Sequence, residues 1–186
     1  LSADARQFYQ GLDKGTAKPT KAELAQAKHH FIDSLKLTDT YSAAQYQREA
    51  ETLMNLLFPT SPTLVVVGGS ALYMDAIWYQ MDEMPEVSTD IRNQLNTRLQ
   101  SEGLTGLVAE LAKVDPATFE TIDAQNPVRV IRALEVYHAS GKPISFFRKG
   151  KKARQTPYRI FKIGLQDDRS TLYERIDQRV LQMVDN

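Results

Sequence analysis

A carboxylate, a guanidinium and an amide stand close together near the start of the chain, in Asp4, Arg6 and Gln7. A carboxylate can accept a proton as a general base, while the guanidinium and the amide offer fork-shaped donors. Together these groups suit a site that holds a polar, planar ligand and moves a proton on it. A simpler interpretation is also open, because Asp is a preferred helix N-cap and Arg6 would then pair with Asp4 on the surface. The local residues alone favour this simpler interpretation.

A second candidate site follows the apolar run 63–67, which reads Thr-Leu-Val-Val-Val. A short run that is apolar on both faces is typical of a fully buried, parallel strand. Gly68-Gly69-Ser70 comes next, and a helical pattern covers 71–79. Ligands bind at the carboxyl ends of parallel strands, and the N–H groups at a helix start favour an anion. Ser70 is therefore expected to cap the helix, to donate its hydroxyl to a ligand, or both.

Three arginines that lie on predicted helices are Arg92, Arg129 and Arg132. Arg92 lies in a helix that Ser88 or Thr89 begins, and a solvated surface position is the usual fate of such a residue. Arg129 and Arg132 are three residues apart on the helix from Asn126-Pro127 to Ser140, so they share a face. They could bracket a phosphate, or they could pair with Glu135 and do nothing more.

Other cations and the histidines give weaker signals. The stretch Arg148-Lys-Gly-Lys-Lys-Ala-Arg154 holds five cations in seven residues and follows two phenylalanines. A solvated loop and a contact with a nucleic-acid backbone are about equally expected for this stretch. His29 and His30 are adjacent, and neither helix nor strand spacing would place them on one face, so no metal site is expected there. Arg175 and Arg179 lie four apart on a last helix that follows a strand predicted over 159–165.

The composition bounds the class of protein. The 186 residues are 42% hydrophobic and 25% charged, which is ordinary for a globular protein. Lysine plus arginine equals aspartate plus glutamate at 23 each, so any nucleic-acid contact must come from a local patch. The absence of cysteine excludes disulfides and fits a reducing compartment. No apolar run is long enough to span a membrane, and we expect a cytoplasmic monomer with no membrane partner.

Six motifs in order make the chain resemble the tRNA dimethylallyltransferases, also called tRNA isopentenylpyrophosphate transferases, with details similar to the Bacteroidetes branch. They are Ser2-Ala-Asp-Ala-Arg-Gln7, Gly15-Thr-Ala-Lys-Pro19, Tyr41-Ser-Ala-Ala44, Val67-Gly-Gly-Ser-Ala-Leu-Tyr73, Asn126-Pro-Val-Arg-Val-Ile-Arg-Ala-Leu-Glu135 and Arg175-Ile-Asp-Gln-Arg-Val-Leu-Gln-Met183. The resemblance implies an α/β fold with a P-loop-NTPase-like parallel sheet core flanked by helices. It also implies a core at 1–84, an all-helical, tRNA-facing insertion at 85–125, and a return to the core at 126–186 with the basic loop 148–154.

The resemblance further implies the reaction. Family members transfer a dimethylallyl group from dimethylallyl diphosphate to N6 of adenine 37, beside the anticodon of tRNAs that read codons beginning with U. Asp4 matches the family's general base, Ser70 a contact to the diphosphate in the transition state, and Arg179 a further diphosphate ligand, with Mg²⁺ as cofactor. The positions implied along the tRNA anticodon stem-loop are Asp4, Ala5, Arg6, Gln7, Ser70, Arg92, Val128, Arg129, Val130, Ile131 and Arg132.

Two departures from the family pattern bear on activity. A Gly-rich loop with Lys-Ser/Thr precedes these motifs in the family, and it is absent from this sequence. We therefore expect this chain by itself to be inactive. Ala5 stands where the family usually has Ser, which removes one hydroxyl from the tRNA-facing set. An isopentenyltransferase acting on free adenine nucleotides and a catalytically dead RNA-binding fragment remain as alternatives. The helical insertion and the basic loop favour tRNA.

Overall fold

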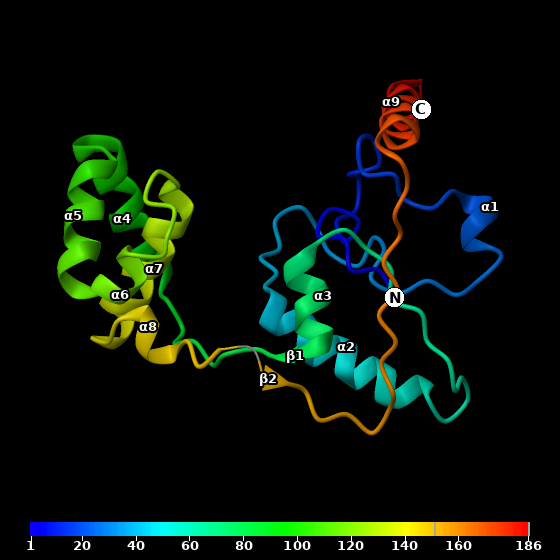
Figure 1. Cartoon of the computed structure of the whole chain (residues 1–186), viewed down its shortest axis with the longest axis horizontal. Helices are drawn as coiled ribbons and strands as arrows, with labels where there is room; N and C mark the ends of the chain where they lie inside the picture. The colour runs from blue at the N-terminus through cyan, green and yellow to red at the C-terminus, as the bar shows by residue number, and fades with distance from the viewer. Residues whose placement is uncertain (151, 186) are drawn as a thin grey trace. The chain divides into compact units, whose positions relative to one another are not determined.

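The computed structural model describes residues 1–150 and 152–185, and two compact units divide them. One unit combines Leu1–Met81 with the chain from Lys152 onward, and the other is 82–151. The first unit contains α1 (Lys21–Leu24), α2 (Ala43–Leu57), α3 (Ala71–Trp78), β1 (Tyr79–Gln80), β2 (Lys152–Ala153) and α9 (Arg169–Asp185). The second contains α4 (Thr89–Glu102), α5 (Leu104–Val114), α6 (Pro116–Phe119), α7 (Pro127–Ser140) and α8 (Ile144–Phe147). Figure 1 labels these elements.

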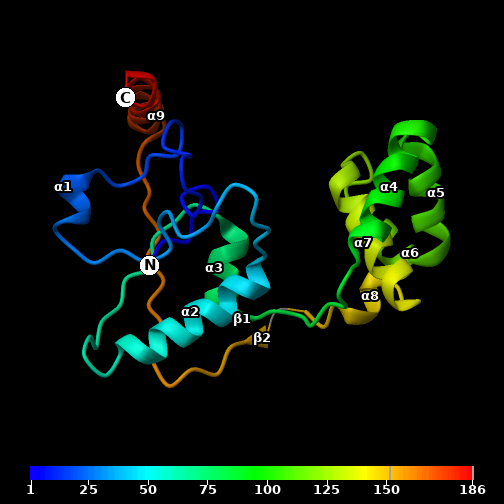
Figure 2. The ribbon, with the colours of Figure 1, turned by 180° about the vertical axis from the view of Figure 1, so that it is seen from behind.

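The first unit is built on α2 and α3, which lie side by side in both views (Figures 1 and 2). Ser42 caps α2, because its hydroxyl accepts the Gln45 N–H at 3.1 Å. Tyr46, Ala50 and Met54 lie at helical spacing and form the buried face of α2. Their core is aromatic at its centre, where the buried Phe8 ring stacks on Tyr46 with centroids 5.5 Å apart.

The parallel sheet expected from the sequence is represented by single bridges in the part of the chain that the structure describes. Ser2 pairs with Val67 and Tyr9 with Leu35, both in parallel, while β1 and β2 form a small antiparallel sheet. The prediction that 63–67 is fully buried is wrong, because Val65 and Val67 are 65% and 66% exposed. One edge of this segment forms backbone hydrogen bonds with the chain at 1–3, and among the described residues no strand pairs with its other edge.

The strand predicted near the end of the chain is also absent from the described residues. Residues 159–165 form no strand, and Ile163 is 86% exposed. The apolar side chains of α9 are open as well, since Leu172, Ile176 and Val180 are all exposed. Apolar spacing indicates which residues would share a buried face, but burial also requires a packing partner, and the described residues supply none for these positions.

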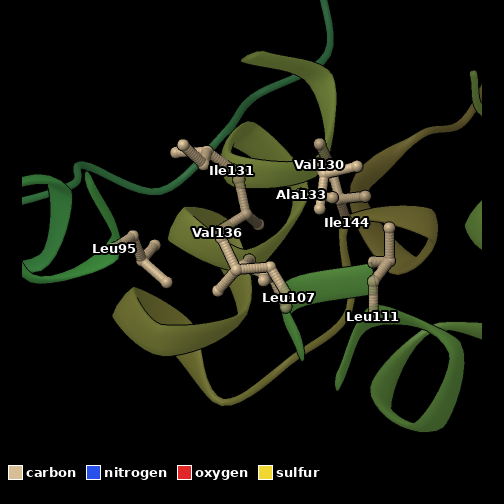
Figure 3. Close-up of a cluster of buried hydrophobic side chains, with 9 residues drawn as sticks. Leu95, Leu107, Leu111, Val130, Ile131, Ala133, Val136 and Ile144 are labelled. Carbon is tan, nitrogen blue, oxygen red and sulfur yellow. The ribbon is translucent and has the colours of Figure 1, made fainter. Parts of the chain in front are cut away.

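The second unit is a small helical bundle with its own core. Buried side chains from α4, α5, α7 and α8 converge in it (Figure 3), namely Leu95, Leu107, Leu111, Val130, Ile131, Ala133, Leu134, Val136 and Ile144. Asn126 caps α7 by accepting the Arg129 N–H, Pro127 occupies its first position, and Gly141 ends it in the left-handed conformation, as the sequence predicts. The second unit covers 82–151 and therefore includes α7, which the resemblance assigned to the part of the chain that returns to the core at 126–186.

Candidate active site and RNA-facing residues

Asp4 lies in a tight turn rather than at the start of a helix. Its carboxylate Oδ1 accepts the Arg6 N–H at 2.9 Å, and its carbonyl accepts the Gln7 N–H at 3.2 Å. This is an Asx-type turn, in which a carboxylate replaces a backbone acceptor. No ion pair joins the Arg6 guanidinium to Asp4 among the described residues. The simpler interpretation of Asp4 as a helix cap paired with Arg6 is therefore wrong, and the second carboxylate oxygen is available to a ligand.

The Gly-Gly turn is held directly against the Asp4 turn. The Ala3 N–H donates to the Val67 carbonyl at 2.7 Å, and the Ser70 N–H donates to the Ala3 carbonyl at 3.3 Å. A Cβ at Gly68 would lie 2.3 Å from both the carbonyl carbon and the carbonyl oxygen of Ala3, so only glycine permits this approach. The structure thus brings together two motifs that are 65 residues apart in the sequence.

Ser70 links the two turns through its side chain. It occupies the N-cap position of α3, but its hydroxyl makes no capping bond with the helix. Instead Ser70 Oγ accepts the Ala5 N–H at 2.9 Å. A hydroxyl that accepts one hydrogen bond still has its own proton to donate. The structure therefore leaves Ser70 able to donate to a ligand, one of the two roles the sequence offered.

Gln7 and Lys18 fasten the loop that follows. Gln7 Nε2 donates to the carbonyls of Thr16 and Ala17 at 3.2 and 3.0 Å. The Lys18 side chain is only 7% exposed, and its Nζ donates to the Tyr9 carbonyl at 2.7 Å and to Asp33 at 2.5 Å. Asp13 accepts a further bond from Lys18 at 3.0 Å. Burial lowers the pKa of Lys18, but its hydrogen bonds to Asp33 and Asp13 outweigh burial and leave the pKa raised.

Sequence reasoning missed this anchoring role of Lys18. A lysine beside a proline in a glycine-containing loop gave no sign that it would be buried. The acidic residues that receive it are five and fifteen positions away, and only the folded loop brings them together. The available signal was the Gly15-Thr-Ala-Lys-Pro19 motif itself.

A cavity of about 1600 Å³ opens beside these turns. Its lining includes Asp4, Gln7, Lys18, Gly68 and Gly69, together with Arg175 and Arg179 of α9. Arg179 is exposed, whereas Arg175 pairs with Asp167 at 3.1 Å. Ala5, Arg6 and Ser70 neighbour lining residues in the sequence but are not themselves among them. The space would admit a ligand between the Asp4 turn and two cations.

Both His29 and His30 lie at the cavity, whereas the cations of the basic loop differ in exposure. His30 lines the cavity, and no cluster of three or more histidine or acidic side chains able to hold a metal occurs among the described residues. In the basic loop, Arg148 and Lys149 are exposed, while Lys151 lies outside the described residues. Arg154 is 10% exposed and pairs with Glu51, so it is not the solvated or RNA-facing cation that the sequence suggested.

Two arginines of the second unit, Arg92 and Arg132, meet at one buried carboxylate. Glu135 is 4% exposed, and its Oε1 accepts Arg92 Nε at 2.7 Å while its Oε2 accepts Arg132 Nη1 at 3.1 Å. Burial raises the pKa of Glu135, but the hydrogen bonds from Arg92 and Arg132 outweigh burial and hold it below its usual value. Arg129 is exposed, and no side-chain partner of it is found in the described part of the unit. The pairing that the sequence offered for both α7 arginines thus holds for Arg132 alone.

The remaining residues expected along the RNA point in opposite directions. Val128 is 75% exposed on the first turn of α7. Val130 and Ile131 are buried in the helical core (Figure 3), so their side chains pack the unit and cannot reach a ligand. A helix that presents one face to a core necessarily buries some members of any continuous run of five residues.

Comparison of the whole chain with known proteins identifies its family. The profile of the IPP transferase family matches residues 7–186. This chain belongs to the IPP transferase family. The tRNA dimethylallyltransferase 2 of Parabacteroides distasonis is 42% identical over 184 residues, covering 99% of this chain and 61% of the relative. The tRNA dimethylallyltransferase 1 of Bacteroides thetaiotaomicron is 43% identical over 185 residues and is 60% covered. The chain therefore spans about three fifths of the length of these relatives.

Solved structures of IPP transferases share the fold. The tRNA isopentenylpyrophosphate transferase of Bacillus halodurans is 34% identical, with a TM-score of 0.57 over 99% of this chain and 56% of that protein. A eukaryotic dimethylallyltransferase acting on tRNA aligns with a TM-score of 0.77 over 99% of this chain and 46% of that protein. At 20% identity the second likeness concerns the fold alone. In the described residues no helix is both long and apolar enough to cross a membrane.

Proposed function

We propose that this chain is the part of a tRNA dimethylallyltransferase that carries the general base and a tRNA-facing helical unit. The substrates would be dimethylallyl diphosphate and a tRNA that reads codons beginning with U, modified on N6 of adenine 37 in the cytoplasm. Membership of the IPP transferase family supports this function. The observation that carries it is the junction of the Asp4 and Gly68-Gly69-Ser70 turns beside a large cavity.

Asp4 is assigned the role of general base. The N6 amine of adenine is a weak nucleophile because its lone pair is delocalised into the ring, so it must lose a proton as it attacks. The amine nitrogen forms a bond to C1 of the dimethylallyl group, and the bond from C1 to the diphosphate oxygen breaks. The diphosphate leaves with the electron pair of that bond, and the N6 proton passes to Asp4. The Asp4 carboxylate has one oxygen fixed by the Arg6 N–H, which leaves the other for this proton.

The leaving diphosphate requires positive charge and hydrogen-bond donors. The Ser70 hydroxyl and the Arg179 guanidinium are the residues that we assign to it, since both belong to the unit that encloses the cavity. Mg²⁺ would neutralise charge on the diphosphate when bound. Magnesium commonly binds through substrate phosphates with few protein ligands. The cavity lining offers carboxylate oxygens, among them those of Asp4 and Asp13, which are of the kind that magnesium binds.

The tRNA would be held by both units. In the first, we assign it Ala5, Arg6 and Gln7, next to the base. In the second, we assign it Arg92, Arg129 and Arg132, with Val128 at the exposed start of α7. The adenine must leave the stack of its loop to reach a base in a cavity. Guanidiniums that bind phosphates of the RNA backbone would hold the anticodon loop in place while the adenine is turned out of it.

The parallel α/β core of the P-loop NTPase type is also part of this proposal. Its support is the parallel bridge between Ser2 and Val67, with a glycine turn and helix directly after it. The chain at 1–3 and the chain at 63–67 would be neighbouring strands of that sheet.

Binding and transfer assays test the function separately. The chain should bind an anticodon stem-loop RNA more tightly than free AMP; the reverse order would favour the isopentenyltransferase that acts on nucleotides. Transfer should then be measured with labelled dimethylallyl diphosphate, on this chain and on a version extended at its N-terminus by a Gly-rich Lys-Ser loop. We expect product only from the extended version. Binding without product from either would support the catalytically dead RNA-binding protein.

A further inference from the structure

Glu135 is a buried carboxylate that joins two arginines from different helices. Arg92 of α4 approaches it with two nitrogens, Nε at 2.7 Å from Oε1 and Nη2 at 3.4 Å from Oε2. Arg132 of α7 approaches Oε2 with Nη1 at 3.1 Å. The Glu135 side chain is 4% exposed, whereas those of Arg92 and Arg132 are 51% and 42% exposed. The anion is therefore covered, and both cations reach the surface above it.

This arrangement leaves donors to spare. A guanidinium carries five N–H groups, and Glu135 has two oxygens to receive them. Arg92 and Arg132 therefore both retain N–H groups that Glu135 does not use. The cluster has a net charge of +1, so it remains attractive to an anion. Two free guanidiniums this close would repel each other, and the carboxylate between them offsets that repulsion.

We propose that Glu135 is a positioning residue, which holds Arg92 and Arg132 side by side so that together they bind one backbone phosphate of the RNA. The inference rests on the proposed function, since it takes the RNA ligand from it. A phosphate is suited to this pair, because guanidiniums bind its oxygens with two parallel hydrogen bonds. Orienting both planes in advance reduces the side-chain entropy that is lost on binding.

The same unit contains a second cluster of similar chemistry, which serves as a control. Glu110 of α5 accepts Arg98 Nη1 at 2.8 Å and His138 Nε2 at 2.7 Å. Its side chain is 23% exposed, so it is less deeply buried than Glu135. Neither Arg98 nor His138 is among the residues that we assign to the RNA. Glu110→Gln removes the same charge from the same unit without disturbing the proposed pair.

The test is the affinity of the full chain for a labelled anticodon stem-loop RNA, measured over a series of salt concentrations. Glu135→Gln removes a negative charge near the phosphate, so charge alone predicts tighter binding. The positioning role predicts weaker binding, because the amide N–H₂ of glutamine cannot accept hydrogen bonds from the two guanidiniums and no longer holds them in place. We expect binding to weaken about tenfold and the slope of log K against log salt to become shallower by about 1. Glu110→Gln should change affinity by less than about twofold.

Arg92→Lys is the second variant, because a half-exposed helix residue can be replaced without disturbing the core. Lysine keeps the positive charge but lacks the paired N–H donors of the guanidinium. Charge alone therefore predicts unchanged affinity for the RNA, whereas the positioning role predicts binding about fivefold weaker. Far-ultraviolet circular dichroism establishes that each variant is folded at the assay temperature. If Glu135→Gln does not fold, Arg92→Lys decides the matter.

The possible failures are distinguishable. A wild-type chain that does not bind the stem-loop RNA overturns the proposed RNA substrate, and the positioning role with it. A wild-type chain that binds, with Glu135→Gln binding equally or more tightly, overturns the positioning role and leaves the RNA substrate standing. Unchanged affinity in Arg92→Lys does the same. If Glu110→Gln weakened RNA binding as much as Glu135→Gln, general destabilisation of the unit would explain both losses. That result would also overturn the positioning role.

Discussion

Gly68 and Gly69 are adjacent, yet their surroundings predict opposite outcomes when each is replaced by alanine. A Cβ on Gly68 would lie 2.3 Å from the carbonyl carbon and oxygen of Ala3 and 2.8 Å from its Cα. A Cβ on Gly69 would meet nothing within 4 Å. The atoms against Gly68 are backbone, so no side-chain rotation can relieve the clash. Gly68→Ala must push the Asp4 turn away from the Ser70 turn.

The cost follows from what that displacement breaks. Overpacking a closely fitted position costs about 1 to 3 kcal/mol of unfolding free energy. Separating the turns also weakens the hydrogen bonds from Ala5 N to Ser70 Oγ and from Ser70 N to the Ala3 carbonyl, each worth about 1 kcal/mol. Because relieving the clash sacrifices these bonds, the two costs overlap, and we expect a total of about 2 to 4 kcal/mol. Gly69→Ala should be neutral or stabilise by up to about 1 kcal/mol, since alanine restricts the unfolded chain.

Trp78 makes this measurement specific to the first unit. It is the single tryptophan of the sequence, it ends α3, and it is partly buried in the unit that holds both turns. Urea unfolding followed by tryptophan fluorescence should show the Gly68→Ala midpoint lowered by about 1 to 2 M, at the usual slopes for small proteins. The Gly69→Ala midpoint should match or exceed that of the wild type. Wild-type stability in Gly68→Ala, or equal losses in both variants, would refute the close approach.

Three further predictions concern single side chains. Lys18→Met should destabilise the first unit by about 1 to 3 kcal/mol in the same urea assay, because the Tyr9 carbonyl, Asp13 and Asp33 lose their shared donor. Asp115→Asn should lower the thermal midpoint of the second unit, followed by circular dichroism, because the buried Asp115 carboxylate accepts both Thr118 N–H and Ser145 N–H at 3.0 Å. Burial raises the pKa of Asp115, but these bonds outweigh burial and lower it from 3.8, so the stabilisation is present above pH 3.8 and is lost as the pH falls through the folded pKa. Asp4→Asn, made in the version extended at the N-terminus, should leave stem-loop binding unchanged and reduce transfer by roughly 10²- to 10⁴-fold, as loss of a general base does.

Matched variants separate these effects from general damage. Lys14→Met changes an exposed lysine of the same loop and should leave the urea midpoint unchanged. Asp123→Asn alters an exposed carboxylate that accepts the Gln125 N–H. It should lower the thermal midpoint less than Asp115→Asn does, and it should keep the loss of stability at low pH that Asp115 causes. Equal effects within either pair would contradict the role assigned to the buried member. Transfer at the wild-type rate by Asp4→Asn would remove Asp4 from the mechanism.

The helices could be predicted in detail because their signals are local. Ser42 and Asn126 cap α2 and α7 through N–H groups three residues ahead, and Gly141 ends α7 with positive φ. Each of these features depends on neighbours within one or two turns, which a single sequence contains in full. The motif order was equally available, and the family match over residues 7–186 confirms the resemblance that it indicated.

The structure of the apolar runs 63–67 and 159–165 could not be predicted in the same way. Apolar runs indicate segments that can be buried between neighbours, but a strand forms only where another strand supplies its hydrogen bonds. In the described chain, 63–67 pairs on one edge with 1–3, and 159–165 has no such partner. The exposure of Val65 and Ile163 follows from missing neighbours and not from their own residue types.

The sequence by itself determined which groups the proposed site can use: a carboxylate in Asp4, a hydroxyl after two glycines in Ser70, and arginines on two helices. Only the tertiary structure decided how they act together. It fixed the Asp4 turn against the Ser70 turn through several hydrogen bonds and the missing Cβ of Gly68, across 65 residues of chain. It also placed Glu135 beneath Arg92, 43 residues away, where α4 and α7 pack. Such pairings depend on contacts between distant segments, which local patterns do not encode.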